Sequence, residues 1–307
     1  MTSPPDTDQI AIAGGEFLMG SDHHYPEEYP TRRVQIASFR IDAYPVTNRR
    51  FAEFVDATGY MTIAERPLDP RLFAGARPED LVPGSLVFLM TEGPVDLGEF
   101  RNWWKWVPGA TWRRPLGPGS SLAGMDDHPV VHVAYPDAVA FARWAGMRLP
   151  SESEWEYAAR GGLDGAVFEW GDEDYQEKAP RINTWQGRFP YENTELDGWT
   201  RTSPVGYYEP NGYGLHDMTG NVWEWTSTRY YEPSARGAAQ RCCGPPKGET
   251  LARARESGPF PSRTIRGGSH LCTVQYCFRY RPAARQPQTI DTSASHLGFR
   301  CVARDRS

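Results

Sequence analysis

Hydrophobic positions along the chain recur mostly over short stretches, and a helical spacing is sustained in only a few of them. The clearest stretch is centred on Phe51 and Phe54, which fall on one face of a helix. Either Thr47 or Asn48 can accept hydrogen bonds from the free N–H groups at its start, and Gly59 can take the left-handed conformation that ends a helix. The pattern predicts an amphipathic helix between these ends.

Two further helices are predicted near the middle of the chain. Asp137 begins one that runs through Ala145, and Gly146 closes it. Ser151 and Glu154 open the next, because the spacing S-x-x-E is that of a capping box, in which each side chain satisfies the other's free backbone N–H. A glycine pair ends this helix.

Strand signals are short and are separated by glycine or proline. Two apolar runs on either side of a Gly-Gly break predict a β-hairpin over residues 10–21, and alternating apolar residues predict a strand over 32–42. The apolar run at 128–135 predicts another strand. Long ordered loops are expected over 62–127, and short strands with glycine turns are expected after residue 163.

Composition favours a loop-rich fold that is pinned by aromatic rings. The 307 residues include 30 Gly, 27 Pro and 11 Trp, and 13% are aromatic. No fixed-period repeat or clear linker divides the chain. We predict a disordered N-terminal tail at residues 1–9, one compact α+β domain over 10–307 with little regular secondary structure, and an exposed loop over 232–262.

Charge and hydropathy argue against two classes of partner. A formal net charge of -6 and a pI near 5.7 leave no broad positive field to attract nucleic acid. The mean hydropathy is -0.61 and no run of about 18 apolar residues occurs, so no membrane-spanning segment is expected. The first residues show neither the basic region nor the apolar core of an export signal, so we expect a cytoplasmic protein.

All five cysteines lie after residue 240, so a disulfide framework distributed through the fold is not expected. Cys272 and Cys277 are separated by four residues, and they can converge only if the chain between them turns back. Two converging thiolates suit a soft monovalent ion such as Cu(I), and the arginines that follow them would favour the thiolate form. A local disulfide or two ordinary buried thiols is the commoner outcome of such a spacing.

Other candidate metal ligands are weaker. Cys242 and Cys243 are adjacent and lie in the predicted exposed loop, so we assign them no role. His128 and His132 have an H-x3-H spacing, but on the predicted strand they would lie about 13 Å apart, and core or hydrogen-bonding roles are favoured. No second C-x2-C pair is present to complete a zinc site.

Oxygen-bearing side chains gather in loops that are rich in glycine and aromatic residues. Asn183, Asp197, Asp217 and Glu224 could contribute to a site for a hard cation such as Ca²⁺. No EF-hand spacing is present, and such residues more often bond the backbone of their own turn.

Six segments of the chain form a recognisable set: GGEFLMGS, YPVTNRRFAEFVDATGY, HPVVHVAYPDAVAFARWAGMRLPSESEWEYAARGG, PNGYGLHDMTGNVWEW, RGGSHLCTVQYCFRYRPAAR and SASHLGFRC. Together they resemble the formylglycine-generating enzyme, or sulfatase-modifying factor, family. The resemblance covers nearly the whole chain from about residue 10, and the C-x4-C pair followed by R-Y-R is its most specific part. It implies the formylglycine-generating-enzyme fold, which is related to C-type lectin-like domains.

The resemblance implies oxidation of a cysteine to Cα-formylglycine by O₂ and Cu(I), with a thiol or other reductant. The substrate would be a Cys-x-Pro-x-Arg segment of an unfolded sulfatase. Cys272 and Cys277 would be the copper thiolates, and the substrate cysteine would be the third ligand. Trp223, Ser269 and Tyr276 match positions that line the copper and oxygen pocket in the family.

The resemblance also implies two structural calcium sites, built from side-chain and backbone oxygens. The first would use Asn183, Thr184, Asp197 and Trp199, and the second Asp217, Gly220, Val222 and Glu224. Thr184 and Trp199 would contribute backbone carbonyls.

Several positions depart from the family pattern. Phe141 and Pro282 stand where some members have disulfide cysteines, which leaves Cys301 without its usual partner and fits a reduced compartment. His296 and Thr273 replace residues that are common near the expected substrate groove, so these two positions bear on peptide preference.

Two other functions compete with this one. A non-haem iron sulfoxide synthase of the ergothioneine type shares much of the fold, but it needs an iron-binding histidine cluster, which we do not find in the sequence. A non-catalytic lectin-like binding module would need neither cysteine. The metal content of the purified protein separates the three functions.

Overall fold

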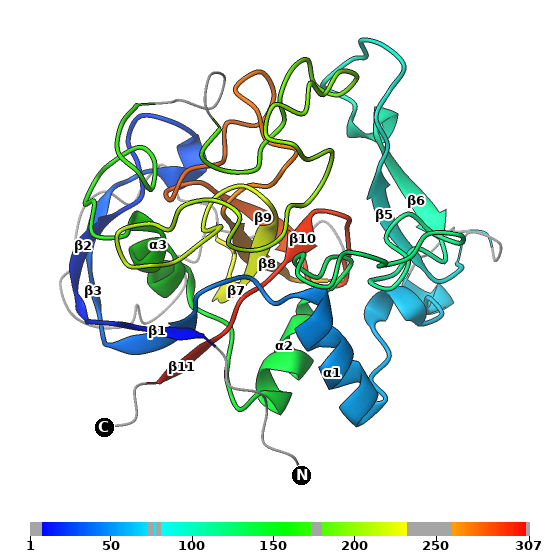
Figure 1. Ribbon diagram of the computed structural model, residues 1–307, viewed down its shortest axis with the longest axis horizontal. Coiled ribbons are helices and arrows are strands. Elements are labelled where there is room, and N and C mark those ends of the chain that lie inside the picture. The colour runs from blue at the N-terminus through cyan, green and yellow to red at the C-terminus, as the bar shows by residue number, and fades with distance from the viewer. Residues whose placement is uncertain (1–7, 73–76, 78–80, 174–179, 232–259, 305–307) are drawn as a thin grey trace.

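The computed structural model describes residues 8–72, 77, 81–173, 180–231 and 260–304. Within these residues, three α-helices and many short strands are joined by long ordered loops (Figure 1). The strands are β1 (Gln9–Ile12), β2 (Gly15–Met19), β3 (Arg32–Ile36), β4 (Phe39–Asp42), β5 (Gly84–Phe88), β6 (Trp104–Pro108), β7 (Trp223–Arg229), β8 (Ser262–Arg266), β9 (Arg285–Thr289), β10 (Leu297–Gly298) and β11 (Val302–Arg304). The helices are α1 (Asn48–Thr58), α2 (Tyr135–Trp144) and α3 (Glu152–Arg160), with short 3-10 turns η1 (Pro26–Glu28), η2 (Ile63–Glu65), η3 (Pro70–Leu72) and η5 (Phe100–Asn102).

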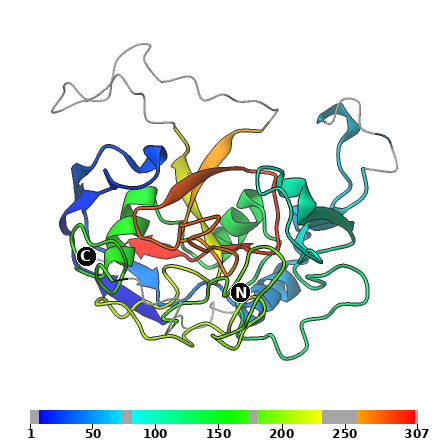
Figure 2. The same ribbon diagram turned by 90° about the horizontal axis from the view of Figure 1, so that it is seen from above.

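Four small sheets organise the described part of the chain. The central sheet has the order β10-β7-β8-β9, with β10 parallel to β7 and the other neighbours antiparallel. A second sheet has the order β1-β4-β11, so strands from the two ends of the chain flank the same neighbour. The pairs β2-β3 and β5-β6 lie at opposite ends of the molecule in both views (Figures 1 and 2).

This architecture confirms the α+β class and the single compact fold with little regular secondary structure. The predicted N-terminal tail extends too far along the chain, because Gln9 already pairs with Asp42 in β1-β4. Most of the predicted 232–262 loop lies outside the described residues, and Ser262 belongs to β8. No helix among the described residues is both long and apolar enough to cross a lipid bilayer.

The three predicted helices form because their end signals act locally. Thr47 caps α1 by accepting from the N–H of Arg50 at 3.3 Å, and Gly59 ends it with a φ of 67°. Ser151 and Glu154 form the predicted capping box of α3. Helix α2 begins two residues before Asp137, because that side chain is a capping group at its N-terminus.

The predicted hairpin over 10–21 is wrong, because β1 and β2 do not pair with each other. β1 pairs with β4, and β2 pairs with β3. The predicted strand over 32–42 is divided at Ala37 and Ser38 into β3 and β4, which belong to different sheets. The Gly-Gly break between β1 and β2 and the Ala-Ser break between β3 and β4 are therefore points where the chain passes from one sheet to another.

The apolar run at 128–135 is not a strand. Only an isolated bridge joins Pro129 to Thr47, and His132 has a φ of 60°, which an extended strand does not allow. Val130 and Val133 are fully buried, so the run packs into the core as irregular chain. Conversely, residues 62–127 were expected to form loops, but they contain the antiparallel strand pair β5-β6.

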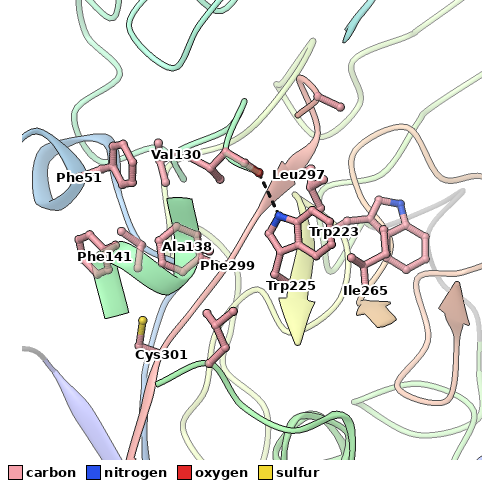
Figure 3. Packing of buried hydrophobic residues seen from close by; sticks show 14 of the residues in the cluster. Phe51, Val130, Ala138, Phe141, Trp223, Trp225, Ile265, Leu297, Phe299 and Cys301 are labelled. Atoms are coloured by element: carbon pink, nitrogen blue, oxygen red, sulfur yellow. Dashed lines mark hydrogen bonds between the residues drawn. The ribbon is translucent and has the colours of Figure 1, made fainter. Parts of the chain in front are cut away.

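Aromatic rings fill the largest cluster of buried residues, between α1, α2 and the central sheet. Phe51 stacks on Phe141 at 5.9 Å between ring centroids, and Phe141 packs against Phe299 at 5.3 Å. Figure 3 shows these rings together with Trp225, whose indole N–H donates to the carbonyl of Val133 at 3.0 Å. A second cluster packs Trp155 of α3 and its neighbours against β1, β2, β3 and β4. These two clusters fix the central sheet from which the site loops extend.

Candidate active site

A glycine pair directly after β8 starts the loop that carries both predicted cysteines. Gly267 and Gly268 have φ values of 97° and 70°, which favour glycine. A Cβ at Gly268 would lie 2.8 Å from the carbonyl oxygen of Arg279. The absence of a side chain therefore lets the outgoing and returning parts of the loop pass in contact.

Cys272 and Cys277 converge as the predicted turn requires. Their sulfur atoms lie 3.0 Å apart, too far for a disulfide bond, and both cysteines are free. Backbone hydrogen bonds between Thr273 and Cys277 close the loop, at 3.1 Å and 2.8 Å in the two directions. The N–H of Ser269 donates to the sulfur of Cys272 at 3.4 Å. The loop thus holds two sulfur atoms side by side without linking them.

The two thiols differ in their electrostatic surroundings. Burial raises the pKa of Cys272 well above its ordinary value of 9.0, and the hydrogen bond to Cys277 adds to this effect. The pKa of Cys277 is lowered, first because Cys272 donates a hydrogen bond to its thiolate and then because the Arg279 guanidinium lies nearby. Cys277 is therefore the readier thiolate, and Cys272 is the thiol that supports it.

A cavity of about 210 Å³ opens beside the two sulfur atoms. All three further residues that the resemblance places in the pocket, Trp223, Ser269 and Tyr276, line it. Tyr276 stacks on Phe189 at 4.6 Å and makes an edge contact with Trp103 at 5.2 Å. The wall on this side of the cavity is aromatic and fixed by ring contacts.

His296 lines the same cavity, and Thr273 does not. The His296 ring contacts Trp104 at 4.6 Å, and burial lowers its pKa to about 3. Its Nδ1 atom is buried without a hydrogen-bond partner. Thr273 lines a neighbouring cavity together with Thr184, so of the two departures only His296 borders the cysteine cavity.

Residues from the N-terminal part of the chain hold Arg279 in place. The guanidinium of Arg279 bonds to the carboxylate of Glu27 at 2.5 Å and lies over the ring of Tyr25 at 3.8 Å. The Tyr25 hydroxyl accepts from the N–H of Phe278 at 3.0 Å. This contact spans about 250 positions of sequence, and no local pattern could have predicted it.

The first predicted calcium set comes together in space. Asn183 and Asp197 are buried, and Asp197 accepts from the N–H of Trp199 at 3.0 Å and from that of Thr184. One side-chain oxygen of Asn183 and one of Asp197 lack any hydrogen-bond partner. Burial raises the pKa of Asp197. Unsatisfied buried oxygens are the atoms that a hard cation would take as ligands.

The second predicted calcium set is arranged differently. Both oxygens of Glu224 accept from the Arg300 guanidinium, at 2.8 to 3.0 Å, and one also accepts from the Trp155 indole at 2.8 Å. Asp217 accepts from the N–H of Gly206 at 2.8 Å. A Cβ at Gly220 would lie 2.5 Å from the Asn183 carbonyl oxygen, so this glycine lets the two sets approach each other.

A third buried carboxylate, which the sequence did not single out, lies beside this set. Glu169 accepts from the Thr219 hydroxyl at 2.8 Å, and its other oxygen has no partner. Burial, and after it the nearby charge of Asp217, raises the pKa of Glu169 to about 8. The loop at 217–220 therefore faces a carboxylate whose charge is poorly compensated.

Comparison with known proteins assigns this arrangement to a family. A family model described as the sulfatase-modifying factor enzyme 1-like domain matches residues 2–305. The chain belongs to the formylglycine-generating enzyme family. It is 56% identical to the formylglycine-generating enzyme of Mycobacterium tuberculosis (strain ATCC 25618 / H37Rv), over 97% of this chain and 98% of that protein.

A second relative agrees with membership of this family, and a solved structure agrees with the fold. The chain is 43% identical to the formylglycine-generating enzyme of Bos taurus, over 98% of this chain and 75% of that protein. PvdO from Pseudomonas aeruginosa has a similar fold, with a TM-score of 0.60 at 23% identity over 97% of this chain and 94% of that one. The family resemblance expected from the sequence is confirmed.

Two other histidines and one other cysteine of this formylglycine-generating enzyme family member are buried but do not line the cysteine cavity. His128 bonds to the Thr202 hydroxyl at 3.1 Å and His132 to the Ser85 hydroxyl at 2.7 Å, so both make the expected hydrogen bonds. Cys301 is fully buried and free. Cys242 and Cys243 lie outside the described residues.

Among the described residues, no three histidine, cysteine, aspartate or glutamate side chains gather to hold a metal ion. The described part of this family member therefore offers no histidine site of the kind that the iron-dependent alternative requires. The two cysteines form a pair of sulfur atoms that lines the cavity.

Proposed function

We propose that this chain oxidises a cysteine in a Cys-x-Pro-x-Arg segment of an unfolded sulfatase to Cα-formylglycine, using O₂ and Cu(I). The observation that carries the proposal is the pair of free thiols, 3.0 Å apart, on the wall of an aromatic cavity in a member of the formylglycine-generating enzyme family. Two soft sulfur donors are the ligand type that Cu(I) prefers.

Cys272 and Cys277 would hold the metal, and bound Cu(I) would supply the redox chemistry through which O₂ reacts. Arg279 favours the thiolate form of Cys277, because a nearby positive charge stabilises an anion. Ser269 donates its N–H to the sulfur of Cys272 and orients it. The aromatic wall limits the access of water to the reacting sulfur atoms.

The size of the cavity favours an unfolded substrate. About 210 Å³ accommodates a few side chains at most, so the substrate cysteine must reach the sulfur pair on an extended segment. Oxidation of the substrate carbon supplies two of the four electrons that reduce O₂ to water, so a thiol or other reductant must supply the rest. We include a cytoplasmic location in the proposal, which accords with the three free cysteines of the described residues.

Structural Ca²⁺ is part of the same proposal. The unpartnered oxygens of Asn183 and Asp197 support the first set, to which Thr184 and Trp199 would add backbone carbonyls. For the second set, Glu224 has no side-chain oxygen free of a donor, and its role stays a prediction. Removal of Ca²⁺ with EGTA should lower the melting temperature, and Asp197→Asn should reduce that response.

Mass spectrometry of a Cys-x-Pro-x-Arg peptide tests the catalytic proposal. Incubation with the Cu(I)-loaded protein and O₂ should remove about 18 Da from the peptide, because sulfur and two hydrogens leave and one oxygen is added. Cys272→Ser and Cys277→Ser should each abolish this conversion, and they should weaken Cu(I) binding by orders of magnitude, because serine offers a hard, protonated oxygen.

Cys301→Ser is the matched control, because Cys301 is as buried as Cys272 and lies outside the cavity. It should keep copper binding and turnover within a few fold. An unchanged peptide under these conditions, or full turnover by Cys272→Ser, would overturn the proposal. Iron in the purified protein would favour the sulfoxide synthase, and the absence of any transition metal requirement would favour a binding module.

A further inference from the structure

Glu169 is one of the buried acidic residues whose carboxylate has an oxygen without a hydrogen-bond partner. It lies at the tip of a tight turn that Phe168 and Gly171 close with two backbone hydrogen bonds, of 2.8 and 3.3 Å. The residue is only 8% exposed. Thr219 holds one oxygen at 2.8 Å, and the other has no partner. A buried carboxylate oxygen without a partner is costly unless something outside the chain binds it.

The turn that presents Glu169 is rigid. The ring of Phe168 stacks on Trp170 at 4.9 Å and on Tyr280 at 5.9 Å, and Phe168 itself is buried. The carboxylate is therefore fixed toward the loop at 217–220 by its own turn and by Thr219. It cannot easily swing into solvent to be hydrated.

The charges around this loop do not balance. Three carboxylates are buried around it, those of Glu169, Asp217 and Glu224. The charge of Asp217 raises the pKa of the other two carboxyl groups, and the Arg300 guanidinium lowers the pKa of all three. When all three carboxylates are ionised, they exceed the one guanidinium by two negative charges, which one bound divalent cation would balance. Since burial penalises uncompensated charge, the fold gains from such an ion.

Glu224 is the least available of the three carboxylates. Arg300 bonds to both of its oxygens and Trp155 bonds to one, so an ion at Glu224 would have to displace these donors. Glu169 can accept an ion without losing its bond to Thr219.

We propose that Glu169 is a carboxylate ligand of a hard divalent cation, Ca²⁺, bound between its turn and the 217–220 loop together with Asp217. Ca²⁺ is favoured over Mg²⁺ because it accepts backbone carbonyls and irregular geometry readily. Only two acidic side chains are required, in keeping with the lack of a three-residue cluster among the described residues. The inference rests on the calcium part of the proposed function and is independent of its copper chemistry.

Calcium titration of the metal-free full-length chain tests this role. The chain is freed of divalent ions with EGTA, and binding of CaCl₂ is followed by calorimetry and by melting temperature. Glu169→Gln should weaken Ca²⁺ binding at one site by at least about tenfold and should reduce the Ca²⁺-dependent rise in melting temperature. Without Ca²⁺, this variant should melt no lower than the parent chain, because the amide no longer repels Asp217.

Asp291→Asn is the matched control, because Asp291 also has a carboxylate oxygen without a partner and lies outside this loop. It should leave Ca²⁺ binding unchanged. If Glu169→Gln fails to fold, Glu169→Asp keeps the charge but shortens the reach, and it should still weaken Ca²⁺ binding relative to the parent chain.

The outcomes separate this inference from the proposed function. If Glu169→Gln binds Ca²⁺ as well as the parent chain does, the role of Glu169 is overturned. Where Glu169→Gln does not fold, the same result with Glu169→Asp overturns it. Loss of bound Ca²⁺ in Asp197→Asn would still support the first set. No Ca²⁺ binding by the parent chain overturns both calcium assignments. Peptide turnover is measured separately, so failure of the copper proposal does not affect either result.

Discussion

Cys272 and Cys277 carry the same chemical group, and their surroundings give them different roles. Cys272 is buried and its thiol donates to Cys277, whereas Cys277 accepts that bond and lies near the Arg279 guanidinium. Glu27 and Tyr25 hold Arg279 in place. One thiol is thus prepared as an anion while its neighbour supplies a proton for the hydrogen bond.

The first prediction concerns the pH at which Cys277 becomes reactive. In metal-free protein, alkylation of Cys277 by iodoacetamide should have its midpoint below the ordinary thiol pKa of 9.0, because the thiolate is stabilised. Arg279→Met should move this midpoint upward by about one pH unit, since one source of positive charge is lost. Mass spectrometry of the alkylated peptides isolates Cys277 from the other cysteines.

Arg33→Met is the control for this experiment, because Arg33 is exposed and pairs with Asp164 away from the cavity. Its alkylation profile should match that of the parent chain. A profile for Arg279→Met that also matches the parent chain would show that Arg279 does not influence the thiol.

At the scale of elements, the helices could be predicted and most strand pairings could not. A capped helix depends on residues within one turn, such as Thr47 with Arg50 or Ser151 with Glu154. A strand depends on a partner that can lie anywhere in the chain, as β11 pairs with β4 across some 260 residues. The hairpin over 10–21 was therefore the natural local prediction, and it is wrong.

The second prediction tests the capping box of α3. Ser151→Ala should lower the free energy of unfolding by about 1 kcal/mol, because the N–H of Glu154 loses its acceptor at 3.2 Å. Urea unfolding followed by circular dichroism measures this change. Ser38→Ala, at an exposed serine between β3 and β4 and away from the cap, should have a smaller effect. Equal losses in the two variants would mean that the cap does not stabilise the helix.

The site was predictable to the extent that its residues are close in sequence. The C-x4-C spacing required a turn, and the family resemblance supplied Trp223, Ser269 and Tyr276, which line the same cavity. Glu169 carried no sequence signal, because its importance lies in an unpartnered oxygen that only the packing around it reveals. Tyr25 and Glu27 could not be predicted for the same reason, because they reach Arg279 from a distant part of the sequence.

At the scale of the whole molecule, long-range contacts carry the structure of the site. The buried pair between Glu28 and Arg281 has two hydrogen bonds, of 2.9 and 2.6 Å, and joins η1 to the loop after Cys277. The N-terminal and C-terminal parts of the chain must therefore assemble before the sulfur pair acquires its surroundings. Breaking such a buried pair leaves an uncompensated charge, so the site is sensitive to changes far away in sequence.

His132 joins four separate segments in the same way. Its ring bonds to the Ser85 hydroxyl at 2.7 Å and to the carbonyl oxygen of Pro115 at 2.9 Å, and its backbone N–H donates to Ala294 at 3.0 Å. The carbonyl of Pro115 can only accept, so Nε2 is the protonated ring nitrogen and Nδ1 accepts from Ser85. The neutral ring is the form that fits this position.

The third prediction follows from the fully buried His132 ring. Burial lowers its pKa to about 4, against about 6.5 in the unfolded chain. The stability that the neutral ring provides is thus fully present above pH 6.5 and is lost as the pH falls toward 4. At pH 5 the loss is about 2 kcal/mol relative to pH 7.5. The difference in unfolding free energy between the parent chain and His132→Gln should shift by this amount, since glutamine does not titrate. Urea unfolding at both pH values measures this shift, and Gln35→Ala, at an exposed position, is the control. If the difference between the parent chain and His132→Gln does not change with pH, the ring is protonated as easily in the folded chain as in the unfolded one.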